Sequence, residues 1–235
     1  MYLKWDTKTI TDFSETNINS LYNQGYLFTR TGKGEMYQTR SLRIDLPKFE
    51  LSSENRRVLR KTEEIKLEAT TLPYADYNWT IGKLGKDFYD TKFGDKTFSA
   101  NKIKELMTEA EKSNFNVVFV YNVGAYCYTP SPSTIPPVGY AICRETDIIL
   151  HYCYPFYQLT DARAYSNTPL PANLGLGMML KTIVWAKEQN KKYIYLGSFS
   201  RPTDTYKLQF AGLEWWDGEG WKNDLEGLKL LLKNK

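Results

Sequence analysis

The sequence predicts an α/β (α+β) fold with a mixed, largely antiparallel sheet flanked by helices. The first observation is a pair of strand-like runs, Val138–Arg144 and Asp147–Tyr154, separated by the turn Glu145-Thr146, which is the pattern of an antiparallel hairpin. The second is a glycine-containing segment, residues 173–177, that leads into an apolar run of helical period and then into the strand Lys192–Leu196. Together they place helices against a sheet.

The other elements follow from apolar periodicity and from helix-capping residues. Ser52 or Ser53 is expected to cap a helix with an acidic first turn and a basic body, and Ser99 is expected to cap a second helix with one apolar face. In chain order we expect a strand within Glu35–Leu46, helices over Glu54–Glu64 and Lys102–Lys112, a strand over Asn116–Asn122, the hairpin, the glycine-led helix, the strand Lys192–Leu196 and a final helix over Asp224–Leu232. Residues 70–99 show no clear period.

We expect two lobes, an N-terminal lobe of residues 1–113 that carries the basic helix and a C-terminal lobe of residues 114–235. A Pro-rich connection, which includes Pro130, Pro132, Pro136 and Pro137, is long enough to be a functional loop or an insertion.

Composition excludes several classes of protein. The 235 residues are 42% hydrophobic, which fits a globular protein with one sizeable core or two small lobes that share a sheet. No apolar stretch has the length of a membrane span. The N-terminus has no secretory signal pattern, so we expect a cytoplasmic protein without a membrane partner. Cys127, Cys143 and Cys153 form no C-x-x-C pair, so we expect neither a disulfide framework nor a metal site.

His151, the single histidine, lies in an aromatic and β-branched run typical of a central strand. It is either a hydrogen-bonded core residue or a catalytic group. Since the chain has no Gly-x-Ser-x-Gly turn, the sequence does not support a Ser-His-Asp hydrolase.

The segment Asn173-Leu174-Gly175-Leu176-Gly177 opens a helix, and backbone N–H groups at such a position can hold an anionic ligand. The alternative is a tight strand-to-helix connection without a ligand. The order of hairpin, glycine turn, helix and strand resembles the GCN5-related N-acetyltransferase fold, whose donor motif is Q/R-x-x-G-x-G/A. Ala172 stands at the first position here, which departs from that motif. Both lobes could have this fold.

Two separated segments resemble the aminoacyl-tRNA–protein transferases, the arginyl and leucyl transferases. The first, Phe49–Lys61, is similar to the family's F-x-P-S-x-S-Q-R-R-V-L-R-R segment. The second matches the family's Y-x-Y-L-G-Y-W-I…K-M-x-Y-K-x-x-F-x-P-L-E segment at Tyr193–Gly197, Tyr206-Lys207, Phe210 and Leu213-Glu214. Gly25-Tyr26, Gly32 and Tyr37 are similar to its N-terminal pattern.

The resemblance implies transfer of an amino acid, arginine or leucine, from charged tRNA to the N-terminal α-amine of a protein whose first residue is acidic. The co-substrate would be aminoacyl-tRNA, with no further cofactor, and we expect a monomer. Three departures affect the acceptor side: no cysteine lies in Glu35–Leu42, where the family has a cluster, and Thr203-Asp204 and Ala211-Gly212 replace the family's K-M and R-P.

Aminolysis of an ester needs an aligned amine, a proton acceptor and a stabilised oxyanion, but no activated nucleophile. The candidates are Tyr206, Lys207, Asp204 and Glu214 for catalysis; Arg56, Arg57, Arg60 and Lys61 for tRNA; Asn173, Gly175, Gly177 and Tyr195 for the donor; and Arg43 and Arg201 for the acceptor. Tyr206 and Tyr195 are equally explained as core tyrosines. The four cations on one helix are equally explained as a solvated face paired with neighbouring glutamates.

Two alternative functions stay open. One is an acetyl-coenzyme A–dependent N-acyltransferase, which would have a pyrophosphate pocket at Gly175–Gly177. The other is a non-catalytic binding module of the same fold. The indole-rich segment Glu214–Trp221 is either a hydrophobic lid over the C-terminal helix or a stacking surface for the terminal adenine of tRNA.

Overall fold

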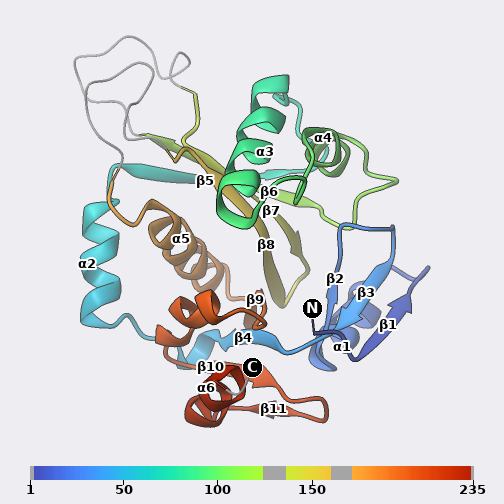
Figure 1. Cartoon of the computed structure of the whole chain (residues 1–235), viewed down its shortest axis with the longest axis vertical. Helices are drawn as coiled ribbons and strands as arrows, with labels where there is room; N and C mark the ends of the chain where they lie inside the picture. Colours follow the sequence, from blue (N-terminus) through green and yellow to red (C-terminus); the bar gives the residue numbers. More distant parts are fainter. Residues whose placement is uncertain (1–2, 124–135, 160–170, 234–235) are drawn as a thin grey trace. The chain divides into compact units, whose positions relative to one another are not determined.

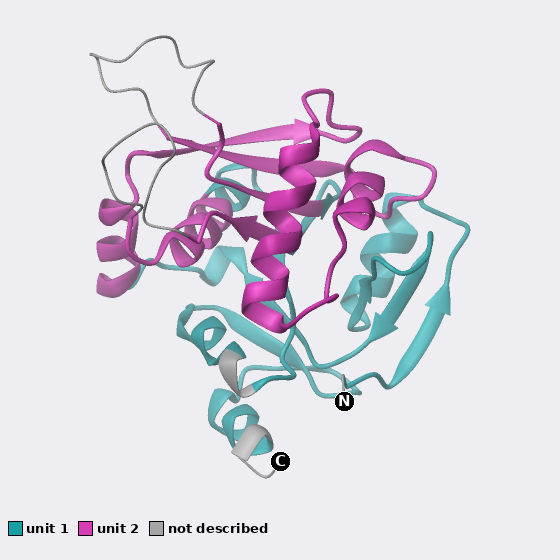
Figure 2. Ribbon diagram, turned by 45° about the horizontal axis from the view of Figure 1, so that its top comes forward, with its two compact units in different colours: residues 1–52, 144–153, 185–235 teal, residues 53–143, 154–184 magenta. Residues whose placement is uncertain are grey.

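The computed structural model describes residues 3–123, 136–159 and 171–233, and its class is α+β, as the sequence predicts. These residues fall into two compact units that interleave along the chain (Figure 2). Unit 1 contains residues 1–52, 144–153 and 185–235, and unit 2 contains residues 53–143 and 154–184. The lobe boundary expected at residue 113 lies inside unit 2. Of the Pro-rich connection, Pro130 and Pro132 lie outside the described residues.

Unit 1 has a three-stranded antiparallel sheet of order β1-β3-β2 and a second set of strands of order β11-β10-β4-β9-β8. All pairs of the second set are antiparallel except β8 with β9, so the sheet is mixed and largely antiparallel, as expected. The elements are β1 (Asp6–Thr9), α1 (Glu15–Asn23), β2 (Tyr26–Phe28), β3 (Glu35–Gln38), β4 (Ser41–Asp45), η1 (Leu46–Lys48), the first part of β8 (Ile149–Tyr157), β9 (Tyr193–Ser198), η3 (Pro202–Gln209), β10 (Leu213–Trp216), β11 (Trp221–Lys222) and α6 (Leu225–Lys233).

The core of unit 1 is centred on Tyr22 of α1, which is fully buried. Its ring lies 4.9 Å from the ring of Tyr195 on β9 and 6.0 Å from that of Phe28 on β2, both at steep angles. Buried aromatic pairs of this geometry contribute about 0.5–1.5 kcal/mol each beyond burial. The helix therefore joins both sets of strands of the unit.

Unit 2 has an antiparallel arrangement of order β7-β6-β5 with helices packed against it (Figure 1). Its elements are α2 (Ser53–Lys61), β5 (Ile65–Thr71), α3 (Trp79–Phe93), α4 (Ala100–Thr108), β6 (Val117–Val123), β7 (Gly139–Glu145), the second part of β8 and most of α5 (Leu174–Glu188). Gly82 and Gly85 let α3 approach Ala100 and Ile103 of α4 closely. Phe88 of α3 packs on Tyr157 of β8, with ring centroids 4.7 Å apart.

Several expected boundaries were wrong. Residues 35–46 form two strands, because the chain turns at Thr39, whose carbonyl accepts from the Ser41 amide at 2.7 Å. The helix expected to reach Glu64 ends at Lys61, since the Ile65 amide donates to the Thr62 carbonyl and starts β5. The helix expected over Lys102–Lys112 begins earlier and ends at Thr108. Its expected cap is confirmed, because the Ser99 hydroxyl accepts from the Lys102 amide at 3.1 Å.

Candidate functional site

Lys207 is the most unusual of the predicted catalytic residues, because it is a lysine with only 8% of its surface exposed. It lies on η3, just after β9. Its Nζ donates to the carbonyl of Ser198 at 3.0 Å and lies 3.7 Å from Oδ1 of Asp204. Burial lowers the pKa of Lys207, and the charge of Arg201 lowers it further, while Asp204 opposes both. The site thus holds an amine that gives up its proton more easily than an exposed lysine.

Asp204 fixes the loop on which Lys207 lies. Its Oδ2 accepts from the backbone amides of Ser200 and Arg201, both at 3.0 Å, and its own amide donates to the Arg201 carbonyl. A carboxylate that receives two backbone N–H groups is held rigidly. The remaining oxygen is the one near Lys207. Asp204 therefore acts as an anchor for the loop as well as a partner for the lysine.

The other two predicted residues of η3 lie at the surface. Tyr206 is 46% exposed, and the Lys207 Nζ lies 5.9 Å from the centre of its ring. Arg201 is exposed at the start of η3. The structure therefore brings Arg201, Asp204, Tyr206 and Lys207 together on one segment, with the amine inside and the phenol and guanidinium outside.

Three further predicted residues, Arg43, Tyr195 and Glu214, form a second cluster in unit 1. Arg43 on β4 is 5% exposed, and its Nε donates to Oε2 of Glu214 on β10 at 2.8 Å. Its Nη1 donates to Oδ1 of Asn23 at 2.9 Å and lies 3.5 Å from the Tyr195 hydroxyl. Burial raises the pKa of Tyr195 to about 12, so this hydroxyl stays protonated.

Aromatic rings enclose the Arg43 guanidinium on both sides. Its Cζ lies 3.9 Å from the ring centre of Tyr193 and 3.9 Å from that of Trp221. Glu214 also lies 3.8 Å from Nζ of Lys48. The donors of Arg43 are thus engaged within the protein, an arrangement that stabilises the β4–β10 pair. Their roles in acceptor binding and catalysis stay predictions.

His151 is a core residue of unit 1. It is 3% exposed and shares a hydrogen bond of 2.9 Å between its Nδ1 and the Tyr22 hydroxyl. Burial, helped by the charge of Lys207, lowers the pKa of His151 to about 3. The imidazole is therefore neutral at physiological pH, in agreement with the hydrogen-bonded core role that we weighed against catalysis.

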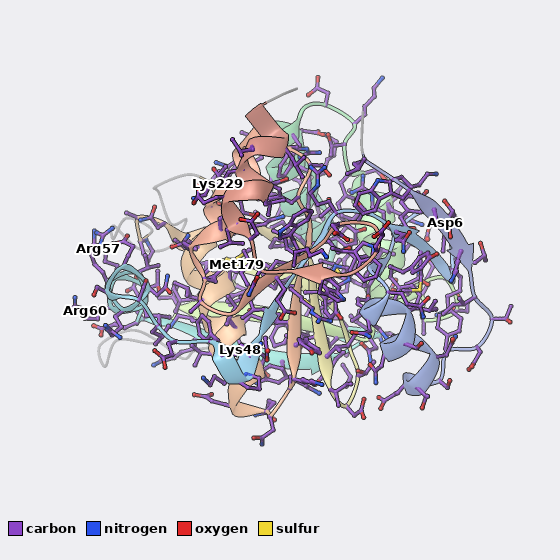
Figure 3. The ribbon with its side chains drawn as sticks, turned by 90° about the horizontal axis from the view of Figure 1, so that it is seen from below. Asp6, Lys48, Arg57, Arg60, Met179 and Lys229 are labelled. Atoms are coloured by element: carbon purple, nitrogen blue, oxygen red, sulfur yellow. The ribbon has the colours of Figure 1, made fainter. Side chains whose placement is uncertain are left out.

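The basic helix α2 lies in unit 2, and its cations differ in their contacts. Arg57 forms an exposed ion pair with Glu54, one turn earlier. Arg56 and Arg60 line a surface hollow together with Ser53 and Leu59. Arg57 and Arg60 extend outward from the helix (Figure 3). The Arg57–Glu54 pair is part of the solvated, self-paired face that we expected as the alternative. In the described part of the chain, neither Arg60 nor Lys61 forms an ion pair with a carboxylate.

The glycine segment is not a turn before a helix, because Gly175 and Gly177 lie within the first turns of α5. Asn173 precedes the helix with a φ of 66°, a conformation that asparagine tolerates. A Cβ on Gly175 would lie 2.6 Å from the Tyr157 hydroxyl, and one on Gly177 would lie 2.5 Å from the Thr62 side chain. Side chains of unit 2 therefore fill the space beside both glycines.

This packing also has a consequence for the basic helix. Thr62 directly follows α2, so the end of α2 and the first turns of α5 touch within unit 2. Lys181 of α5 and Lys66 of β5 add to the positive charge, and the pKa of Lys181 is lowered by burial and by Lys66. Sequence patterns did not identify these two lysines, since they lie on different elements from the basic run.

Sequence reasoning also did not single out Arg40, which is buried just before β4, or Ser200, which is half-buried just after β9. Both have buried polar side-chain atoms that lack a hydrogen-bond partner in the described ranges. Within the described ranges, no group of three or more His, Cys, Asp and Glu residues is placed to hold a metal ion. No helix of the described residues is long and apolar enough to cross a membrane.

Comparison with known proteins gives one informative relative. The chain is 26% identical over 222 residues to an aspartate/glutamate leucyltransferase of Dinoroseobacter shibae, with 90% of this chain and 73% of the relative covered. No protein-family model matches. The relative confirms the resemblance to aminoacyl-tRNA–protein transferases that the sequence motifs carry.

Similar solved structures include L-PGS from Bacillus licheniformis, with a TM-score of 0.45, 11% identity and 80% of this chain covered. Another is the GCN5-related glucosamine N-acetyltransferase region of a fungal multi-domain β-N-acetylglucosaminidase, with a TM-score of 0.48, 9% identity and 92% of this chain covered. The chain spans about half the length of the first, at 52%, and less than a quarter of the second, at 23%.

Proposed function

We propose that this chain transfers an amino acid, leucine or arginine, from charged tRNA to the N-terminal α-amine of a peptide or protein whose first residue is acidic. The observation that carries the proposal is the sequence relation to a leucyltransferase across 90% of the chain. The buried amine of Lys207, in a segment that matches the transferase motif, is consistent with the chemistry.

The reaction forms a C–N bond between the acceptor amine and the ester carbonyl, and it breaks the C–O bond to the ribose. The amine loses a proton and the ribose oxygen gains one. In our proposal Lys207 in its neutral form accepts the amine proton and passes it to the leaving oxygen, and Asp204 holds the loop in place. Tyr206, exposed beside Lys207, positions the acylated end of the tRNA.

The donor would bind through the cations of α2 and the neighbouring α5. Arg56 and Arg60, which line the surface hollow on α2, are proposed phosphate contacts together with Lys61, and Arg57 is partly neutralised by Glu54. The assignments of Asn173, Gly175, Gly177 and Tyr195 to the donor, and of Arg43 and Arg201 to the acceptor, stay predictions from the sequence.

The test is transfer of radiolabelled amino acids from separately charged tRNAs to peptides that begin with Asp, Glu or Ala. We expect incorporation that requires charged tRNA and falls at least 100-fold in Lys207→Met, while Lys83→Gln, an exposed lysine of α3, keeps wild-type activity. Absence of transfer from every tRNA would reject the proposal. Acetylation of the peptides with acetyl-coenzyme A instead would favour the N-acyltransferase alternative.

A further inference from the structure

Arg40 is a buried cation, and two of its nitrogens lack a hydrogen-bond partner among the described residues. It lies between β3 and β4 in unit 1, and only 8% of its surface is exposed. Its Nε and Nη1 are both buried, and neither forms a hydrogen bond with the described residues. Burial lowers the pKa of Arg40, and no charged neighbour contributes to that shift. Arg43, three residues later, has a carboxylate, an amide oxygen and two rings around it.

An unpaired buried guanidinium costs several kcal/mol, so a fold keeps one only where a partner arrives from outside or where it serves another purpose. The backbone around Arg40 is well fixed. Its carbonyl accepts from the Phe199 amide at 2.8 Å. The hydroxyls of Thr39 and Ser41 donate to the carbonyls of Leu3 and Gly25. The backbone that carries the cation is therefore fixed by hydrogen bonds on both sides of Arg40.

A second polar group without a hydrogen-bond partner in the described residues lies just after the end of β9. Ser200 follows Phe199, and its buried Oγ forms no hydrogen bond with the described residues. The nearby carboxylate of Asp204 is engaged by two backbone amides and by Lys207. Arg40 and Ser200 thus each have a buried side-chain atom able to donate a hydrogen bond, and Ser200 directly follows Phe199, the residue whose amide is bonded to the Arg40 carbonyl.

We propose that Arg40 and Ser200 form an oxyanion site that binds the side-chain carboxylate of the acceptor's first residue. This inference rests on the proposed function. A carboxylate fits this proposal better than a nucleic-acid phosphate, because Arg40 is only 8% exposed and a small planar group needs less room than a nucleic-acid backbone, whose phosphates would meet exposed cations such as Arg60.

The place of the site agrees with that role. The Ser198 carbonyl, one residue before Phe199, accepts from Nζ of Lys207. The proposed carboxylate site and the proposed proton acceptor are therefore linked through three consecutive residues of unit 1. An acidic first residue bound at Arg40 would have its α-amine a few bonds away, which suits acylation of that amine.

The test is equilibrium binding of fluorescent peptides that begin with Asp, Glu, Asn or Gln, without tRNA. We expect the wild type to prefer Asp and Glu, and Arg40→Met to bind them about 10- to 100-fold more weakly while its affinity for Asn and Gln peptides stays unchanged. Ser200→Ala should give a smaller loss of the same kind. Lys192→Gln, an exposed cation of the same unit, is the matched control.

Thermal unfolding and tRNA binding separate the alternatives. Arg40→Met should unfold at the wild-type temperature or above, because an unpaired buried charge is removed. Strong destabilisation by Arg40→Met would overturn the inference, as would loss of tRNA binding with peptide selectivity intact. If the wild type selects acidic peptides through Arg40 but transfers no amino acid, the site stands and the proposed function fails. If transfer occurs and Arg40→Met keeps its selectivity, the reverse holds.

Discussion

At the scale of single residues, burial decides the ionisation of His151 and thereby part of the pH dependence of stability. The ordinary pKa of histidine is about 6.5, and burial lowers the pKa of His151 to about 3. Between these values the unfolded chain binds a proton that the folded protein does not. Stability is therefore lost as the pH falls from about 6.5 to about 3, with a slope of about 1.4 kcal/mol per pH unit.

The wild-type pH dependence is compared with that of the variant His151→Asn, whose side-chain amide can still share a hydrogen bond with the Tyr22 hydroxyl. We expect the free energy of unfolding, measured by urea denaturation, to fall more steeply with acid in the wild type than in this variant. Above pH 7 the two curves should run parallel. Parallel curves down to pH 4 would contradict a neutral buried imidazole.

For Arg43 we expect substitution to lower the stability of the fold, because its charge is paired with that of Glu214. Arg43→Met leaves the carboxylate of Glu214 without its closest partner and opens the space between Tyr193 and Trp221. We expect a loss of about 3–5 kcal/mol in the free energy of unfolding. The double variant Arg43→Met/Glu214→Gln should lose less than the sum of the single losses. Unchanged stability in Arg43→Met would show that the residue serves binding alone.

At the scale of elements, the first turns of α5 depend on the small size of Gly177. Alanine favours a helix over glycine by about 1 kcal/mol, but a Cβ here would lie 2.5–2.9 Å from three side-chain atoms of Thr62. Thr62 is β-branched and its hydroxyl is bonded to the Val58 carbonyl, so it cannot move easily. We expect Gly177→Ala to destabilise the protein by about 1–3 kcal/mol.

Chemical denaturation measures this effect, and two further variants interpret it. Gly220→Ala, at a position with open space around the glycine, should change stability by less than about 0.5 kcal/mol. Thr62→Ala combined with Gly177→Ala should recover part of the loss, since the two nearest atoms are gone. If Gly177→Ala is stable but fails to bind a donor, the glycine serves a ligand rather than packing.

The length and apolar pattern of each helix and strand explain whether it could be predicted from the sequence. Strands β6 to β9 have continuous apolar runs, and α4 has both a cap and an apolar face, so their positions were close to those expected. Helix α3 was missed because Gly82 and Gly85, which allow its close packing, also lower helix propensity and hide the period. Strands β1 and β2 have only four and three residues, too few for a period to show.

The candidate site was predictable only in part, for a related reason. The transferase motif identified Lys207, and the candidate Asp204, which replaces a residue of that motif, lies close to it on the same segment. Arg40 and Arg43, by contrast, look alike in sequence, three residues apart. Their difference, an unpartnered cation against a clamped one, depends on residues from distant parts of the chain such as Glu214 and Trp221.

At the scale of the whole molecule, charge distribution decides how the two substrates respond to salt. The net charge is only +4, yet unit 2 gathers cations on α2, β5 and α5. A tRNA contacts many phosphates and releases their counterions, whereas a peptide would contribute one carboxylate. We expect the KM for charged tRNA to rise steeply between 50 and 200 mM salt, and the KM for the peptide to change little.

Substitutions in α2 test whether the salt dependence of tRNA binding comes from the cations of this helix. Arg60→Gln/Lys61→Gln should reduce the slope of log KM for tRNA against log salt by about two units, because two phosphate contacts are lost. The control, Lys83→Gln/Lys86→Gln, removes two exposed lysines of α3 that are already paired with Asp87 and Asp90. Its slope should equal that of the wild type. If both double variants lower the slope equally, tRNA responds to overall charge and α2 is not its binding surface.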